Sequence, residues 1–134
     1  MATALVLVQS VTSVLIVDDE EDIANILRQF LTQAGFNAVS FTSPLLALEH
    51  FMHNPLAYPV IITDLRMPGM SGIELANKIR EINTAAKIFM ITAFDPIDLE
   101  SRPDYGQAKI ERVIQKPLKL FQLKKTIEQA LQTQ

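Results

Sequence analysis

The feature that most constrains the fold is a short apolar run at residues 14–17, Val-Leu-Ile-Val, which ends abruptly at two aspartates. Such a run, rich in β-branched residues, is typical of a strand that is buried on both faces of a parallel sheet. Ile23, Leu27 and Leu31 then recur at helical spacing, and Gly35 follows as a helix stop. The first unit of the chain is therefore a strand followed by a helix.

The same alternation continues along the sequence. Its apolar periodicity predicts strands at residues 14–17, 36–41, 58–63, 87–92 and 110–114, and helices at residues 23–31, 44–54, 72–82 and 120–131. Ser43-Pro44 and the capping-box pair Ser71 and Glu74 indicate where two of the helices start. Alternating elements with short connections predict an α/β fold, a parallel sheet with helices on both faces and right-handed crossovers.

One element between the last two strands is poorly encoded. Residues 95–109 include Pro96, Pro103 and Gly106, which disfavour a regular helix. Asp95 can cap a short helix that begins at Pro96, and Pro103 should end it. We therefore expect one or two turns of helix followed by a loop.

Length and composition favour a single folded domain. The chain has 134 residues, 49% of them apolar and 20% charged, which is enough apolar material for one core. A net charge of −3 gives no indication of a nucleic-acid partner, and the absence of cysteine fits a reducing compartment. The apolar residues 4–8 are too few to cross a bilayer, so we expect a cytoplasmic protein with a tail at residues 1–10 and one domain at residues 11–134.

Polar side chains stand at the carboxyl ends of four predicted strands. Asp18 and Asp19 follow the first strand, Asp64 follows the third, Thr92 ends the fourth and Lys116 follows the fifth. In open parallel α/β sheets, ligands bind outside the carboxyl ends of the strands. We therefore expect these five residues to share one rim.

The residue types at this rim indicate phosphoryl-transfer chemistry. Three converging carboxylates repel one another unless a cation is present. Because the side chains of Asp18, Asp19 and Asp64 offer only oxygen as a ligand atom, we expect them to bind a hard ion such as Mg²⁺. A metal and a lysine can neutralise an incoming phosphoryl group, and an aspartate can be the nucleophile. Asp64 is the best candidate because it stands alone at its strand end, whereas the other two form a pair suited to metal.

The rim motifs resemble a known family. Read in order, they are Asp18-Asp19, Asp64-Leu65-Arg66-Met67-Pro68-Gly69, Thr92-Ala93 and Lys116-Pro117. This set resembles the signature of two-component receiver domains, and the resemblance extends from about Val11 to the C-terminus. It implies the flavodoxin-like, doubly wound, five-stranded sheet with strand order 2-1-3-4-5.

The resemblance also implies a role for each rim residue. Asp64 would accept a phosphoryl group from the phosphohistidine of a histidine kinase or phosphotransfer protein. Asp19, Asp64, the backbone carbonyl of Arg66 and, through water, Asp18 would hold Mg²⁺. Thr92 and Lys116 would contact the phosphoryl oxygens, and the bond before Pro117 would be cis. Such a chain catalyses only its own phosphorylation and dephosphorylation and switches the binding of a downstream protein, without itself binding nucleic acid or inserting into a membrane.

The sequence departs from the family at the position three before the conserved lysine. Receivers commonly carry an aromatic residue there that relays phosphorylation to the surface, whereas this chain has Val113. The relay and the partner contacts of the family therefore do not transfer to this chain. Arg66 and Phe94 should line the entrance to the phosphoryl group, and we hypothesise that Phe94 limits the access of water.

Three other functions compete with this interpretation. A haloacid-dehalogenase-like phosphatase needs a carboxylate two residues after its nucleophile, where Arg66 stands. A flavin carrier needs a phosphate loop after the first strand, where an acidic run stands. A receiver-like binding scaffold without phosphorylation remains open, as does the question of whether the chain acts alone, like chemotaxis regulators, or is a fragment. His50 and His53 are expected at the surface without a role.

Overall fold

The computed structural model describes residues 11–132. The predicted tail at residues 1–10 lies outside the described residues. The strands are β1 (Ser13–Val17), β2 (Asn37–Phe41), β3 (Val60–Asp64), β4 (Lys87–Thr92) and β5 (Arg112–Gln115). The helices are α2 (Glu21–Gln33), α3 (Pro44–His53), α4 (Gly72–Ile82), α5 (Pro96–Glu100), α6 (Tyr105–Ala108) and α7 (Leu120–Gln132).

The five strands form one parallel sheet in the order β2-β1-β3-β4-β5, which confirms the predicted topology. Every residue of β3 is buried, and β1 and β4 are buried except at their first residues, because both faces of these strands are covered. Since all strands run in the same direction, their carboxyl ends lie at one edge of the sheet. That edge carries the candidate site.

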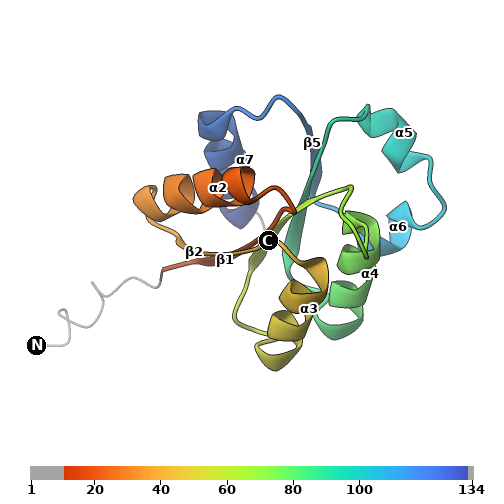
Figure 1. The fold of residues 1–134 in the computed structure, drawn as a ribbon, viewed down its shortest axis with the longest axis horizontal. Helices are drawn as coiled ribbons and strands as arrows, with labels where there is room; N and C mark the ends of the chain where they lie inside the picture. Colours follow the sequence, from red (N-terminus) through yellow and green to blue (C-terminus); the bar gives the residue numbers. More distant parts are fainter. Residues whose placement is uncertain (1–10, 133–134) are drawn as a thin grey trace, which may run out of the picture.

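Helices cover the two faces of the sheet separately, as Figure 1 shows. On one face Val14 and Ile16 pack with Leu27 of α2 and Ile127 of α7. On the other face Leu15 belongs to a second core cluster, to which α3, α4, α5 and α6 contribute buried residues. Successive strand residues point to opposite faces, so one apolar run supplies both layers of the core. In residues 11–132 no helix is long and apolar enough to cross a membrane.

Several strand boundaries differ from the prediction by one or two residues, and the two largest differences have a local cause. β3 begins at Val60 rather than at Tyr58, because Pro59 lacks the N–H group that a strand would use. β5 begins at Arg112 rather than at residue 110, because the chain is still turning at Lys109, whose φ of 49° is left-handed. β3 also ends one residue later than predicted, so Asp64 is its last residue and does not follow it.

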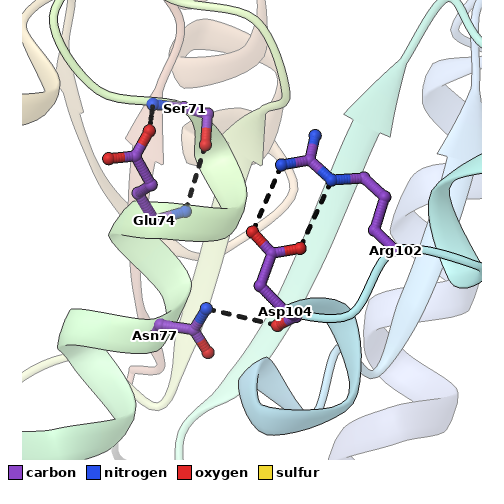
Figure 2. A network of polar contacts seen from close by, with 5 residues as sticks. All are labelled: Ser71, Glu74, Asn77, Arg102 and Asp104. Carbon is purple, nitrogen blue, oxygen red and sulfur yellow. Dashed lines mark hydrogen bonds and ion pairs between the residues drawn. The ribbon is translucent and has the colours of Figure 1, made fainter.

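The segment between β4 and β5 contains two short helices. The predicted short helix at Pro96 is confirmed as α5, but α6 was not predicted. α4 anchors this segment with two side chains. Arg80 donates from Nε to the carbonyl of Ala108 at 2.8 Å and from Nη2 to that of Lys109 at 2.9 Å. Asn77 donates to the carbonyl of Asp104 at 3.2 Å, a contact that Figure 2 shows. The segment therefore depends on α4 for its position.

Candidate functional site

The side chains at the strand ends meet in the structure. Carboxylate oxygens of Asp18, Asp19 and Asp64 all lie within 4.8 Å of one another. Nζ of Lys116 lies 3.4 Å from Oδ1 of Asp64. Thr92 ends the adjacent strand β4. We call these five residues, Asp18, Asp19, Asp64, Thr92 and Lys116, the carboxyl rim.

Asp64 is held by its backbone at the end of β3. The N–H of the next residue, Leu65, donates to the carbonyl of Ile91 in β4 at 3.0 Å. The hydroxyl of Thr63 donates to the carbonyl of Asp64 itself at 2.9 Å. Only 8% of the Asp64 surface is exposed. Hydrogen bonds of the residues on either side of Asp64 therefore fix its backbone, and this places its side chain at the rim.

A glycine at the first position of α4 lets that helix approach Asp64. A Cβ atom on Gly72 would lie 2.2 Å from the Asp64 carbonyl oxygen and 2.6 Å from Sδ of Met90. No side chain larger than hydrogen fits there, because the nearest atom belongs to backbone that cannot move away. The N–H of Gly72 also donates to the carbonyl of Leu65 at 2.7 Å. The sequence predicted Gly72 only as a helix start, since the neighbour it meets is distant in the chain.

Asp18 is the most buried acid of the rim. Its Oδ1 accepts a hydrogen bond from the N–H of Glu20 at 2.9 Å, while its Oδ2 is buried without a hydrogen-bond partner among the described residues. Burial raises the pKa of Asp18 to about 6, an effect that the Glu20 N–H partly offsets and that the nearby charge of Asp64 reinforces. Because burial of an unpaired carboxylate oxygen is costly, a bound cation would stabilise Asp18 at this position.

Lys116 partly compensates the charge of Asp64. Burial raises the pKa of the Asp64 carboxyl above its usual range, and the ammonium group of Lys116 opposes this rise. The Lys116–Pro117 peptide bond is cis, as expected. One lysine cannot balance three carboxylates, so the rim retains a negative charge. Oxygen donors with excess negative charge fit a hard divalent cation such as Mg²⁺.

Thr92 is buried and has its hydroxyl oriented by the backbone. Its Oγ1 accepts a hydrogen bond from the N–H of Phe94 at 2.9 Å, and only 1% of the surface of Thr92 is exposed. Because a hydroxyl that accepts one hydrogen bond still carries its own proton, Thr92 can donate to a further acceptor at the rim. A phosphoryl oxygen on Asp64 would be such an acceptor.

Arg66 and Phe94 stack at the edge of the rim. The guanidinium carbon of Arg66 lies 4.3 Å from the centre of the Phe94 ring. Together with Leu65, Ser71 and Leu99, they line a pocket of about 310 Å³. The sequence predicted that both residues lie at the entrance, but the contact between them depends on two loops that only the fold brings together.

The two histidines lie outside the carboxyl rim. His53 is exposed, as predicted, but His50 is half-buried. Its Nε2 lies 2.7 Å from the hydroxyl of the buried Tyr58, and its ring packs 5.1 Å from that of Phe41. The expectation of a surface position was therefore wrong for His50, because its partners come from two other segments of the chain.

The comparison with protein families agrees with this geometry. Residues 14–128 match the family model described as "Response regulator receiver domain". The chain belongs to this family. It is thus a receiver domain of two-component response regulators, a class of protein that acts in phosphorelay signal transduction.

Individual relatives support the assignment. The receiver is 33% identical over 118 residues to the "Response regulator receiver protein CpdR" of Brucella abortus, which covers 88% of this chain and 95% of CpdR. It is 34% identical over 119 residues to a "Cyclic di-GMP phosphodiesterase" of Thermotoga maritima, covering 89% of this chain but only 31% of that protein. The similarity to the phosphodiesterase is therefore confined to about a third of its length.

A solved structure gives the same result for the fold. The response regulator TrrA of Thermotoga maritima, determined in complex with Mg²⁺-BeF, superimposes with a TM-score of 0.77 at 28% identity. The match covers 88% of this chain and 97% of TrrA. The receiver therefore shares the chemotaxis-regulator-like fold that its motifs implied.

Proposed function

We propose that the receiver accepts a phosphoryl group on Asp64 and thereby switches the binding of a partner protein. The observation that carries the proposal is the position of Asp64, a largely buried carboxylate 3.4 Å from Lys116 and within 4.8 Å of Asp18 and Asp19. At this position the Asp64 carboxylate can act as a nucleophile, and the nearby ammonium group of Lys116 can stabilise the phosphorylated product. Asp64 therefore serves as phosphoacceptor.

The donor is the phosphohistidine of a histidine kinase or phosphotransfer protein. A carboxylate oxygen of Asp64 attacks the phosphorus, an O–P bond forms, and the P–N bond to the imidazole breaks. The leaving imidazole nitrogen keeps the electron pair of that bond and takes up a proton from solvent. Later, water attacks the phosphorus, the O–P bond breaks, and inorganic phosphate and the free carboxylate of Asp64 are released.

Lys116 and Thr92 stabilise the product. After transfer of the phosphoryl group to Asp64, the ammonium of Lys116 pairs with the phosphoryl oxygens instead of with the free carboxylate. Thr92 donates its hydroxyl proton to another phosphoryl oxygen while still accepting from the N–H of Phe94. Both contacts strengthen as negative charge develops on the oxygens, so they favour transfer as well as the phosphorylated state.

Asp18, Asp19, Asp64 and the backbone carbonyl of Arg66 would hold Mg²⁺, with Asp18 acting through water. The unpaired Oδ2 of Asp18 and the clustering of the three carboxylates support this assignment. When bound, the metal supplies positive charge beside the phosphoryl oxygens. TrrA, a receiver of the same fold, was solved with Mg²⁺-BeF, which is further support.

The receiver acts on itself and not on an external phosphate ester. An aspartate-nucleophile phosphatase needs a second carboxylate two residues after the nucleophile, and Arg66 occupies that position with its side chain against Phe94. We place the protein in the cytoplasm, where histidine kinases present their phosphohistidine. The downstream partner is a protein, and the domain itself needs no nucleic acid.

Incubation with acetyl phosphate and Mg²⁺ tests this function. We expect intact-protein mass spectrometry to show a gain of one phosphoryl group, which disappears in Asp64→Asn and when Mg²⁺ is chelated. Asp104→Asn is the matched control, since Asp104 is paired with Arg102 away from the rim. Absence of a mass gain in the parent protein would overturn the proposal in favour of a binding scaffold that is not phosphorylated.

A further inference from the structure

Phe94 is a large apolar residue whose backbone is tied to the rim. Its ring is 41% exposed, although most large apolar side chains of the domain are buried. Its N–H donates to Oγ1 of Thr92 at 2.9 Å. The position of Phe94 therefore depends on where the Thr92 hydroxyl lies.

Arg66 connects the same ring to Asp64. Arg66 lies in the loop after β3, two residues beyond Asp64 at the strand end. Phe94 lies in the loop after β4, two residues beyond Thr92 at the strand end. The guanidinium of Arg66, 4.3 Å from the ring centre, joins these two loops. Among residues 11–132 no hydrogen bond or ion pair of the Arg66 guanidinium competes with this stack. The stack therefore bridges the two strand ends that carry the phosphoacceptor and its threonine.

The stack also shapes the surface. Arg66 and Phe94 line the pocket of about 310 Å³ between the β3–α4 loop and α5, whose other walls include the buried Leu65 and Leu99. A movement of the Phe94 ring changes the opening of this pocket. By contrast, Val113 of the edge strand β5 is half-buried against the core and has no ring that could turn outward.

We propose that the Arg66–Phe94 stack is the element by which this receiver reports the state of Asp64 at its surface, a role that rests on the proposed phosphorylation. A phosphoryl group on Asp64 attracts the Thr92 hydroxyl, which carries the N–H of Phe94 with it. The same negative charge attracts Arg66. Both partners of the stack therefore move towards the rim, the ring becomes less exposed, and the pocket entrance narrows.

A single tryptophan can follow this movement. The chain contains no tryptophan, so Phe94→Trp creates one reporter on the stack, and Val113→Trp creates the matched reporter at the position where other receivers have an aromatic residue. We expect acetyl phosphate with Mg²⁺ to lower the acrylamide quenching constant of Trp at position 94 and shift its emission to the blue. At position 113 both quantities should stay nearly constant.

Two further substitutions test the route. In the Phe94→Trp background, Thr92→Ser keeps the hydroxyl and should retain the response, whereas Thr92→Val should reduce it at an equal extent of phosphorylation. Arg66→Gln removes the cation and should also reduce the response, and the double variant Thr92→Val/Arg66→Gln should lose it. If the full response persists in the double variant, the phosphoryl charge acts on the ring directly and the proposed route is wrong.

Parallel mass spectrometry separates this inference from the function on which it rests. A mass gain with no change in quenching at position 94 overturns the stack as reporter and leaves phosphorylation intact. A response at position 113 that equals or exceeds that at position 94 also overturns it. No mass gain in any variant overturns both proposals.

Discussion

The α5–α6 segment, residues 96–108, begins shortly after the rim residue Thr92, but the carboxyl rim and this segment are held in place by different means. The rim acids Asp18 and Asp64 lie at the ends of central strands that pair on both sides. The α5–α6 segment consists of two short helices that bury Leu99 and Ala108 in the core and whose segment accepts hydrogen bonds at backbone carbonyls from Asn77 and Arg80 of α4. Sheet pairing positions the chemistry, and individual side chains position the neighbouring segment.

Because of this difference, we expect the two regions to respond differently to substitution. A parallel sheet with buried strands specifies its register strongly, so residues at the strand ends keep their places. A segment held by a few side-chain contacts can change when one of those side chains changes. We therefore expect single substitutions to disturb the α5–α6 segment more readily than the strand ends that carry the carboxyl rim.

The largest expected effect is on stability, when one methyl group is added at a glycine in each region. Gly72→Ala should destabilise the protein by about 3 kcal/mol or more, because the new Cβ would lie 2.2 Å from the Asp64 carbonyl oxygen. Gly106→Ala, in α6, should change stability by less than about 1 kcal/mol, since nothing lies within 4 Å of its Cβ. Urea unfolding of both variants measures the difference, and similar midpoints would contradict it.

The next effect concerns the pH dependence of the rim. The pKa of Asp18 is raised from 3.8 to about 6, so the folded state binds its proton more tightly than the unfolded state. This contribution to stability is fully present below pH 4 and is lost as pH rises through 6. Without Mg²⁺, ionised Asp18 therefore costs up to about 3 kcal/mol at pH 7.5.

Asp18→Asn isolates this contribution from the other titrating groups. In chelator, the variant should be more stable than the parent at pH 7.5, and the difference should shrink as pH falls to 5. With millimolar Mg²⁺ at pH 7.5 the order should reverse, because only the parent has the complete acid set. Thermal or urea unfolding measures each difference, and a gap that is constant with pH would contradict the assignment.

A third prediction addresses the anchor of the α5–α6 segment. Arg80→Leu should destabilise the domain by about 2 kcal/mol, because it leaves the carbonyls of Ala108 and Lys109 without their donor. Hydrogen exchange should increase at residues 101–111 before it increases at the rim. Arg28→Leu is the control, since within residues 11–132 the Arg28 side chain makes one 3.4 Å hydrogen bond, to Asn25 of its own helix. Equal exchange throughout the domain would show that the segment is not a separate unit.

The smallest expected effect is kinetic. Phe94→Glu should speed dephosphorylation several-fold, because a polar side chain at the entrance admits and orients water where the ring excludes it. Ile97→Glu adds the same charge at a side chain that is 73% exposed in α5 and should leave the rate nearly unchanged. Loss of the phosphoryl mass with time measures both rates. A rate for Phe94→Glu no faster than that of the parent would count against this role.

Much of the fold was predictable from the sequence because its signals are local. Apolar runs and helix caps locate the strands and helices, and the prolines of residues 95–109 predict the short α5. The two largest errors at strand boundaries concern the starts of β3 and β5. Pro59 delays β3 beyond Tyr58, and the left-handed backbone of Lys109 ends the unpredicted α6 and delays β5. Neither follows from periodicity, because a single residue decides each.

The sequence by itself determined which residue types stand at the strand ends, and therefore that acids, a threonine and a lysine share one rim. Only the tertiary structure decided how they are held. The burial of Asp18, the glycine beneath Asp64 and the contact between Arg66 and Phe94 each depend on atoms from segments that are distant in the chain. Local patterns carry no information on such contacts, because packing sets them after the elements have formed.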